Sequence, residues 1–172
     1  MTPFNVFVDV INLDDASVKN TLSSISSMYH SFTSKHQRKI SFIYDIQSER
    51  VKMLNDTAKN LEIDHAVSVS NFDAMYAQGK SISIFVDFGD TVATTKIISL
   101  LEIGVPFLGQ SNSERKEILD NTCSILANTK SNFDLFPSII SFMRMLYYDP
   151  EVRKILKRGA LIKSKNIKIL AK

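Results

Sequence analysis

The residues of this sequence best suited to chemistry lie in its middle third. Four of them together favour an anion: Gly89, Thr94, Thr95 and Lys96. The threonines begin an amphipathic run at 94–103, and the first turn of a helix offers free backbone N–H groups and the positive end of its dipole. The hydroxyls add donors, Lys96 adds a cation, and Gly89 lets the backbone approach a ligand. This spacing predicts a phosphate-type anion site, against the competing interpretation that Thr94 only caps a helix and Lys96 is a solvated surface residue.

Other catalytic chemistry finds little support in the residue types. The single cysteine, Cys123, lies in an apolar stretch and is expected to be a buried core residue. The three histidines, His30, His36 and His65, lie far from it in sequence and form no metal-ligand spacing with a cysteine or carboxylate. We therefore predict no catalytic residue and no metal site.

The elements that must position the anion site alternate between short β-branched runs and longer amphipathic runs. We expect strands at 5–11, 39–44, 65–69, 82–86, 105–108 and 123–126, and helices at 16–29, 49–61, 71–78, 94–103, 113–120, 133–148 and 150–158. Such alternation predicts an α/β, Rossmann-like, doubly wound sheet of six mostly parallel strands with helices on both faces. Ligands of such sheets bind beyond the carboxyl ends of the strands.

Charge divides the 172 residues into a domain at 1–158 and a basic C-terminal tail at 159–172. Residues 1–152 carry 13 Lys and Arg against 18 Asp and Glu, whereas residues 153–172 carry eight Lys and Arg and no acid. The tail is interpreted either as a solvated helix end or as a peripheral contact to an anionic membrane. It lacks aromatic residues for base stacking, so nucleic acid is not an expected partner. The first residues show no secretory signal, so we expect a cytoplasmic location.

Residues 84–108 resemble the donor-binding segment of GT-B glycosyltransferases. They read as a strand, a glycine-containing loop, a helix that begins at Thr94-Thr95-Lys96, and Gly104-Val105-Pro106 before another strand. The stretch 149–156 also resembles the closing Asp-x-x-x-Arg-x-x-Leu helix of these domains. The resemblance implies the C-terminal, nucleotide-sugar-binding half of such an enzyme. It implies no resident cofactor, and a UDP-sugar or other nucleotide sugar held by Gly89, Thr94, Thr95, Lys96 and Ser99.

The sequence departs from the family pattern at the acidic positions. Many family members have two glutamates with seven residues between them around this helix, and those places fall here at Thr91 and Ser99. A serine cannot accept the paired ribose hydroxyl bonds that a carboxylate accepts. Asp14 and Asp15, after the first strand, would repel a diphosphate. With room for one domain only, the chain is expected to be incomplete as an enzyme alone, and a missing N-terminal-type domain or a partner protein would complete it.

Three interpretations follow from this pattern. The chain is a glycosyltransferase donor domain that is active only with its missing half, or it is a non-catalytic relative that binds proteins. The glycosyltransferase-like components of accessory secretion systems, which handle glycoproteins, are of the second kind and have a similar pattern at 86–89 and 104–106. A response-regulator receiver is disfavoured, because its strand-end phosphoacceptor would be Asp87, one βα unit too late, and no Lys-Pro follows the fifth strand.

Overall fold

A computed structural model describes residues 3–77, 81–89, 92–129 and 132–170 of the chain. The strands are β1 (Phe4–Asp9), β2 (Ile40–Asp45), β3 (Val67–Val69), β4 (Ile84–Asp87), β5 (Phe107–Gln110) and β6 (Ser124–Ala127). The helices are α1 (Asp15–His30), α2 (Ser34–Gln37), α3 (Val51–Asn60), α4 (Phe72–Ala77), α5 (Thr94–Glu102), α6 (Ser113–Ile118), α7 (Asn132–Tyr148) and α8 (Pro150–Leu170). Short 3-10 turns at Ser48–Arg50 and Asp64–Ala66 precede α3 and β3.

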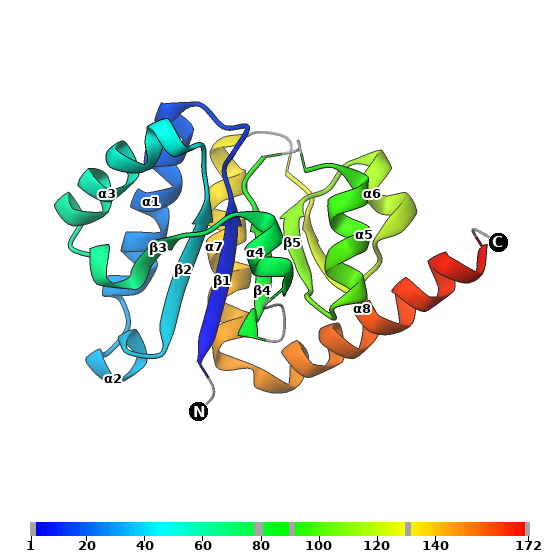
Figure 1. Cartoon of the computed structure of the whole chain (residues 1–172). Helices are drawn as coiled ribbons and strands as arrows, with labels where there is room; N and C mark the ends of the chain where they lie inside the picture. The colour runs from blue at the N-terminus through cyan, green and yellow to red at the C-terminus, as the bar shows by residue number, and fades with distance from the viewer. Residues whose placement is uncertain (1–2, 78–80, 90–91, 130–131, 171–172) are drawn as a thin grey trace.

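The six strands form one sheet in the order β3-β2-β1-β4-β5-β6 (Figure 1). Every pairing between neighbouring strands is parallel, which confirms the predicted fold class and makes the sheet wholly rather than mostly parallel. The strand order reverses between β1 and β4. In doubly wound sheets this switch point opens a crevice at the carboxyl ends of the strands.

Two apolar layers cover the two faces of the sheet. Side chains alternate along β1, so that Val6 and Val8 pack with α1, α3 and α7, whereas Phe7 packs with α4, α5 and α8. Phe7, Phe85 and Phe107 form a stacked row across β1, β4 and β5 on this second face. The rows of large side chains on both faces fix the sheet and hold the carboxyl ends of its central strands side by side.

Local capping explains several helix boundaries. The Asp14 side chain accepts a hydrogen bond from the Ser17 backbone N–H and caps α1. Gly104 has a φ of +71°, which suits glycine, and it ends α5 as expected. The Ser48–Arg50 turn precedes α3, and its N-cap residue, Gln47, makes no side-chain hydrogen bond. The segment between α1 and β2, for which the sequence predicts no helix, contains the single-turn helix α2.

Helix α8 is much longer than the predicted helix at 150–158. The residues expected to form a basic tail continue the same helix to Leu170, and its last turns extend beyond the sheet (Figure 1). Two ion pairs tie this segment to the domain: Lys163 Nζ lies 2.8 Å from Asp120, and Lys168 Nζ lies 3.0 Å from Glu102 at the end of α5. The boundary expected at residue 158 therefore falls within a helix that packs against the domain.

The Asp120–Lys163 pair predicts a small, pH-dependent contribution to stability. Hydrogen bonds from Lys163 and Thr122 lower the pKa of Asp120 to about 2. A carboxyl with a depressed folded-state pKa stabilises the fold above its unfolded pKa of about 3.9 and loses this effect as the pH falls toward 2. Because the pair is largely solvated, Asp120→Asn should lower the free energy of unfolding by under about 1 kcal/mol at pH 7. The free energies of unfolding of the two proteins, measured by urea titration, should converge near pH 2. A difference that persists unchanged at that pH would contradict the assignment of the effect to the Asp120 carboxylate.

Candidate functional site

Three buried aspartates end the three central strands of the sheet. Asp9, Asp45 and Asp87 are the last residues of β1, β2 and β4, and Asp9 is in register with both of the others. All three are buried. The carboxyl edge at the switch point is therefore a row of carboxylates, which require nearby cations to be stable there.

Lys96 neutralises two of these aspartates. It lies in the first turn of α5, and its Nζ lies 2.6 Å from Asp9 Oδ2 and 3.5 Å from Asp45 Oδ2. The ammonium also lies 4.9 Å from the centre of the Phe72 ring. Burial raises the pKa of Asp45, while Lys96 opposes that shift and the Asp9 carboxylate adds to it. Lys96 thus spans the ends of β1 and β2 and is not the solvated surface residue of the competing interpretation.

Arg115 neutralises the third aspartate. This α6 side chain is only 2% exposed, and its guanidinium forms an ion pair with Asp87. The other terminal nitrogen donates to the carbonyl of Gln110 at 2.8 Å and to that of Gly89 at 3.3 Å. The Gly89 N–H in turn donates to Asp87 Oδ1 at 2.8 Å. Burial raises the pKa of Asp87, and Arg115 opposes the shift.

The predicted site residues divide into two groups in the structure. Gly89, Thr94 and Lys96 lie at the carboxyl edge, and Thr95 is in the same helical turn as Thr94 and Lys96. Ser99 lies farther along α5, where its hydroxyl donates to the Thr95 carbonyl at 3.0 Å. Thr91, the place of the first family glutamate, lies outside the described residues.

The sequence analysis did not assign Asp9, Asp45 or Arg115 to this site, and it considered Asp87 only as the phosphoacceptor of a response-regulator receiver. A usable signal existed for the aspartates, since each is the acidic residue that directly follows a buried apolar run. The sequence analysis also weighed Asp14 and Asp15 against an anion site, but the side chains of both residues make other contacts. Asp14 caps α1, and Asp15 pairs with Arg50 at 2.7 Å.

The start of α5 is the part of this edge that still suits an anion. Its N-cap residue, Ala93, provides no side-chain hydrogen bond, so the helix N-terminus lacks a side-chain cap. Thr94, however, donates its hydroxyl to Glu114 of α6, which brings a further carboxylate to this turn. Within the described part of the chain, no group of three or more His, Cys, Asp and Glu could hold a metal ion. The site offers backbone donors to an anion, with its two cations already paired.

Cys123 is a core residue, as predicted. Its side chain is fully buried beneath α5 and α8, and burial raises the pKa of its thiol. The three histidines form hydrogen bonds away from Cys123. His30 is hydrogen-bonded to the Leu61 carbonyl, His36 to the Tyr147 hydroxyl and His65 to the Tyr29 hydroxyl. None of the described helices combines the length and apolar character needed to span a bilayer.

Comparison with known proteins identifies the fold. No protein-family model matches the sequence, and no curated protein matches it. The C-terminal domain of the glycosyl transferase group 1 family protein LpcC from Francisella tularensis matches with a TM-score of 0.70 and 11% identity, over 96% of this chain and 87% of that one. A mutant of S. aureus TarM, solved with fondaparinux, α-GlcNAc-glycerol and UDP, matches with a TM-score of 0.72 and 8% identity, over 95% and 32%. The Glycosylation Associate Protein (Gap123) complex from Streptococcus agalactiae matches with a TM-score of 0.65 and 11% identity, over 96% and 33%.

These likenesses define the class of structure to which the chain corresponds. It has the fold of a C-terminal GT-B glycosyltransferase domain, as the residues at 84–108 predicted. The chain spans nearly all of the LpcC domain but only about a third of the TarM and Gap123 chains. It therefore corresponds to one part of these longer chains.

Proposed function

We propose that this chain is a glycosyltransferase-type donor domain that binds a nucleotide sugar, or a remnant of one such as UDP, and transfers no sugar alone. A missing N-terminal-type domain or a partner protein would complete an active site. If the completed assembly is active, its activity is that of a glycosyltransferase. Gly89, Thr94, Thr95 and Lys96 would receive the diphosphate, and Ser99 would stand where the ribose is held.

The position of the α5 N-terminus carries this proposal. The helix starts at the β1/β4 switch point, where the sheet order reverses and doubly wound folds bind their ligands. Its first turn has no side-chain cap, so backbone N–H groups can meet a phosphate oxygen. Lys96 stands in that turn, and its ammonium is the only described lysine charge that bridges the ends of β1 and β2.

The pairing of Lys96 favours a second candidate function. Asp9 and Asp45 already occupy the ammonium, and Glu114 occupies the Thr94 hydroxyl. A diphosphate at this turn would meet carboxylates as well as donors, which weakens its binding. The alternative is a non-catalytic, protein-binding component of an accessory secretion or glycoprotein-handling complex. The likeness to the Gap123 complex supports it at the level of fold.

We infer a cytoplasmic location with α8 as the surface that would meet an anionic membrane. Its outer face carries Lys154, Arg158 and Lys165, all exposed, beside two exposed isoleucines, Ile155 (63%) and Ile162 (53%). Cations attract anionic headgroups at about 1 kcal/mol each, and apolar side chains enter the interface beside them.

Titration with UDP by calorimetry tests the donor-domain proposal. We expect weak binding to the parent chain and at least about tenfold weaker binding to Lys96→Ala, because the variant loses the cation and leaves Asp9 and Asp45 unpaired beside the phosphate. Lys116→Ala, which removes an exposed lysine from neighbouring α6, is the matched control and should bind like the parent.

The outcomes separate the two candidate functions. Equal binding by the parent and Lys96→Ala would show that UDP sits away from α5. Absence of UDP binding by all three proteins, each with a parent-like circular dichroism spectrum, would favour the protein-binding alternative.

A further inference from the structure

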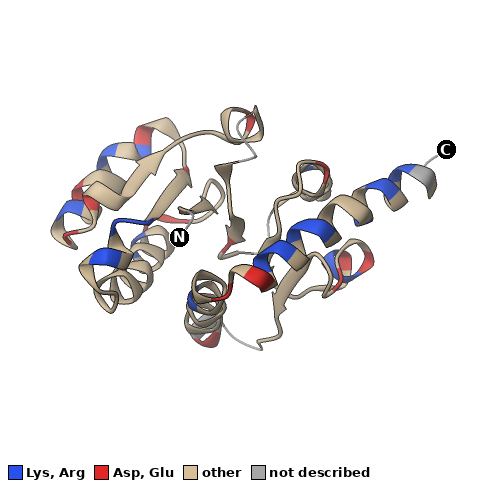
Figure 2. Cartoon of the chain, turned by 90° about the horizontal axis from the view of Figure 1, so that it is seen from below, with Lys and Arg blue, Asp and Glu red and all other residues tan. Residues whose placement is uncertain are grey.

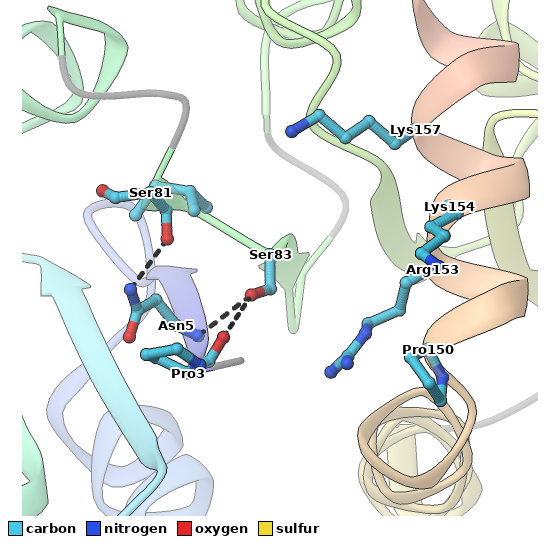
Figure 3. Close-up of a pocket in the computed structure, with 9 residues that line it drawn as sticks. Pro3, Asn5, Ser81, Ser83, Pro150, Arg153, Lys154 and Lys157 are labelled. Atoms are coloured by element: carbon cyan, nitrogen blue, oxygen red, sulfur yellow. Dashed lines mark hydrogen bonds between the residues drawn. The ribbon is translucent and has the colours of Figure 1, made fainter. Parts of the chain in front are cut away.

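A cavity lies at the opposite edge of the sheet from the α5 site. It is bounded on one side by the amino ends of β1 and β4 and on the other by the first turns of α8 (Figure 3). Its volume is about 410 Å³, within the range of small-molecule sites. The residues around it are Pro3, Asn5, Ser81, Ile82, Ser83, Pro150, Arg153, Lys154 and Lys157.

All of the charged residues among the described residues that line this cleft are basic. Three are cations, Arg153, Lys154 and Lys157, and none is a carboxylate. Two acids lie at the start of α8. Asp149 accepts the backbone N–H groups of Glu151 and Val152 and its charge acts on Arg153, and Glu151 pairs with Lys154 at 2.7 Å. The cations belong to the row of lysines and arginines that α8 presents on the lower side of the molecule (Figure 2).

Arg153 and Lys157 carry charges that the described residues leave without an ion-pair partner. Arg153 is half-buried, with its guanidinium carbon 5.0 Å from the centre of the Phe4 ring. Burial lowers the pKa of Arg153, which reflects the cost of removing its charge from water, and Tyr147 and Asp149 oppose that shift. A bound anion would offset that cost, and a planar guanidinium pairs well with phosphate oxygens.

The opposite wall of the cleft is polar and held in place. Asn5 Nδ2 donates to the Ser81 carbonyl at 2.7 Å, and the Asn5 backbone N–H donates to Ser83 Oγ at 3.1 Å. The Asn5 side-chain oxygen accepts from Ser41 of β2 at 2.8 Å. Figure 3 shows Arg153 and Lys157 extending from α8 toward this wall.

We propose that the cleft between the amino ends of β1 and β4 and the start of α8 binds a phosphate group. Arg153 and Lys157 supply the charge, and the Ser83 hydroxyl lies on the facing wall. This phosphate group is either free phosphate or a phosphate monoester in solution, or it is the phosphate of a lipid headgroup. The site lies at the other edge of the sheet from α5, so this proposal does not depend on nucleotide-sugar binding at α5.

Binding of two probes tests the proposal with the full chain. Inorganic phosphate is followed by calorimetry and by the backbone amide shifts of Ser81 and Ser83. Phosphatidylcholine vesicles with and without phosphatidic acid are followed by sedimentation. The Arg153→Gln/Lys157→Gln double variant removes both cleft charges. The matched control is Arg158→Gln/Lys165→Gln, which removes the same net charge from the exposed side of the same helix.

We expect the cleft variant to weaken binding at least about tenfold. The control should leave phosphate binding within about twofold. It should weaken vesicle binding less than the cleft variant does, because Arg158 and Lys165 belong to the α8 face inferred to meet a membrane. Loss of phosphate binding in solution assigns the free-phosphate source, whereas a loss seen only with phosphatidic acid vesicles assigns the headgroup source; either supports the cleft. Equal loss in both double variants would overturn it, because α8 would then act only through its general charge. Absence of binding to both probes by the parent would also overturn it. The single variant Lys157→Gln, at an exposed position, preserves the test if replacing Arg153 disturbs the packing on Phe4.

Discussion

Arg115→Met should lower the free energy of unfolding by about 3–5 kcal/mol. The guanidinium is buried, it pairs with an equally buried carboxylate, and it satisfies the carbonyls of Gly89 and Gln110. Removing one member of a buried ion pair leaves the other charge in a medium that solvates it poorly. Met fills much of the same volume, so the loss reports the stranded Asp87 rather than a cavity. Urea-induced unfolding followed by circular dichroism measures the change.

Two further proteins make this prediction specific. The double variant Arg115→Met/Asp87→Asn carries no unpaired charge and should recover part of the loss. Lys116→Met alters the next residue of α6, which is exposed, and should change stability by less than about 0.5 kcal/mol. A loss below about 1 kcal/mol for Arg115→Met would show that Asp87 does not depend on its partner. Because burial raises the Asp87 pKa, the single variant's deficit should also shrink at acid pH, where that carboxyl is protonated.

The topology of the sheet is predictable from the order of apolar runs. Short β-branched segments separated by amphipathic ones require crossover connections, and the handedness of those crossovers leaves few arrangements other than a parallel sheet. The boundaries of the strands are harder to predict from sequence, because a strand ends where its pairing with the neighbouring strand ends. Residues 65–66, for example, have strand-like neighbours in sequence but form a 3-10 turn before β3.

The length of α8 is hidden by its composition. Its buried positions beyond residue 158 include Ala160 and Ser164, which are small and carry little apolar signal. Residues 159–172 also carry four lysines and no acid, so the charge of the segment resembles that of a solvated tail although five of its residues are Leu or Ile. Packing of α8 against α5, together with the ion pairs of Lys163 and Lys168, supplies the stability that the local sequence does not indicate.

The candidate site shows the same division between local and long-range information. The start of α5 is a local feature, and the Thr94-Thr95-Lys96 sequence is enough to predict it. The direction of the Lys96 side chain is not local, since it depends on Asp9 and Asp45, which reach the same edge only because β1 and β2 pair in register. The family glutamates are absent from the sequence, but the carboxylates that compete with a diphosphate appear only once the sheet is assembled.

Gly159→Ala should lower the free energy of unfolding by about 2 kcal/mol, although helix propensity alone predicts the opposite. Alanine in an exposed helix interior is about 1 kcal/mol better than glycine, so the sequence of α8 favours the change. In the folded protein, a methyl group at this position would overlap the carbonyl oxygen of Thr122 and lie 2.6 Å from its carbonyl carbon. Both are backbone atoms, so α8 must move away from the turn before β6, and overpacking of this kind costs about 1–3 kcal/mol or more.

Urea unfolding of Gly159→Ala beside Asn166→Ala separates the two effects. Asn166 is an exposed α8 position, where the gain in helix propensity acts without a clash. Asn166→Ala should be neutral or slightly stabilising. A Gly159→Ala protein as stable as the parent would mean that α8 does not pack this closely on the domain, and the ion pair of Lys163 with Asp120 would lose its structural basis.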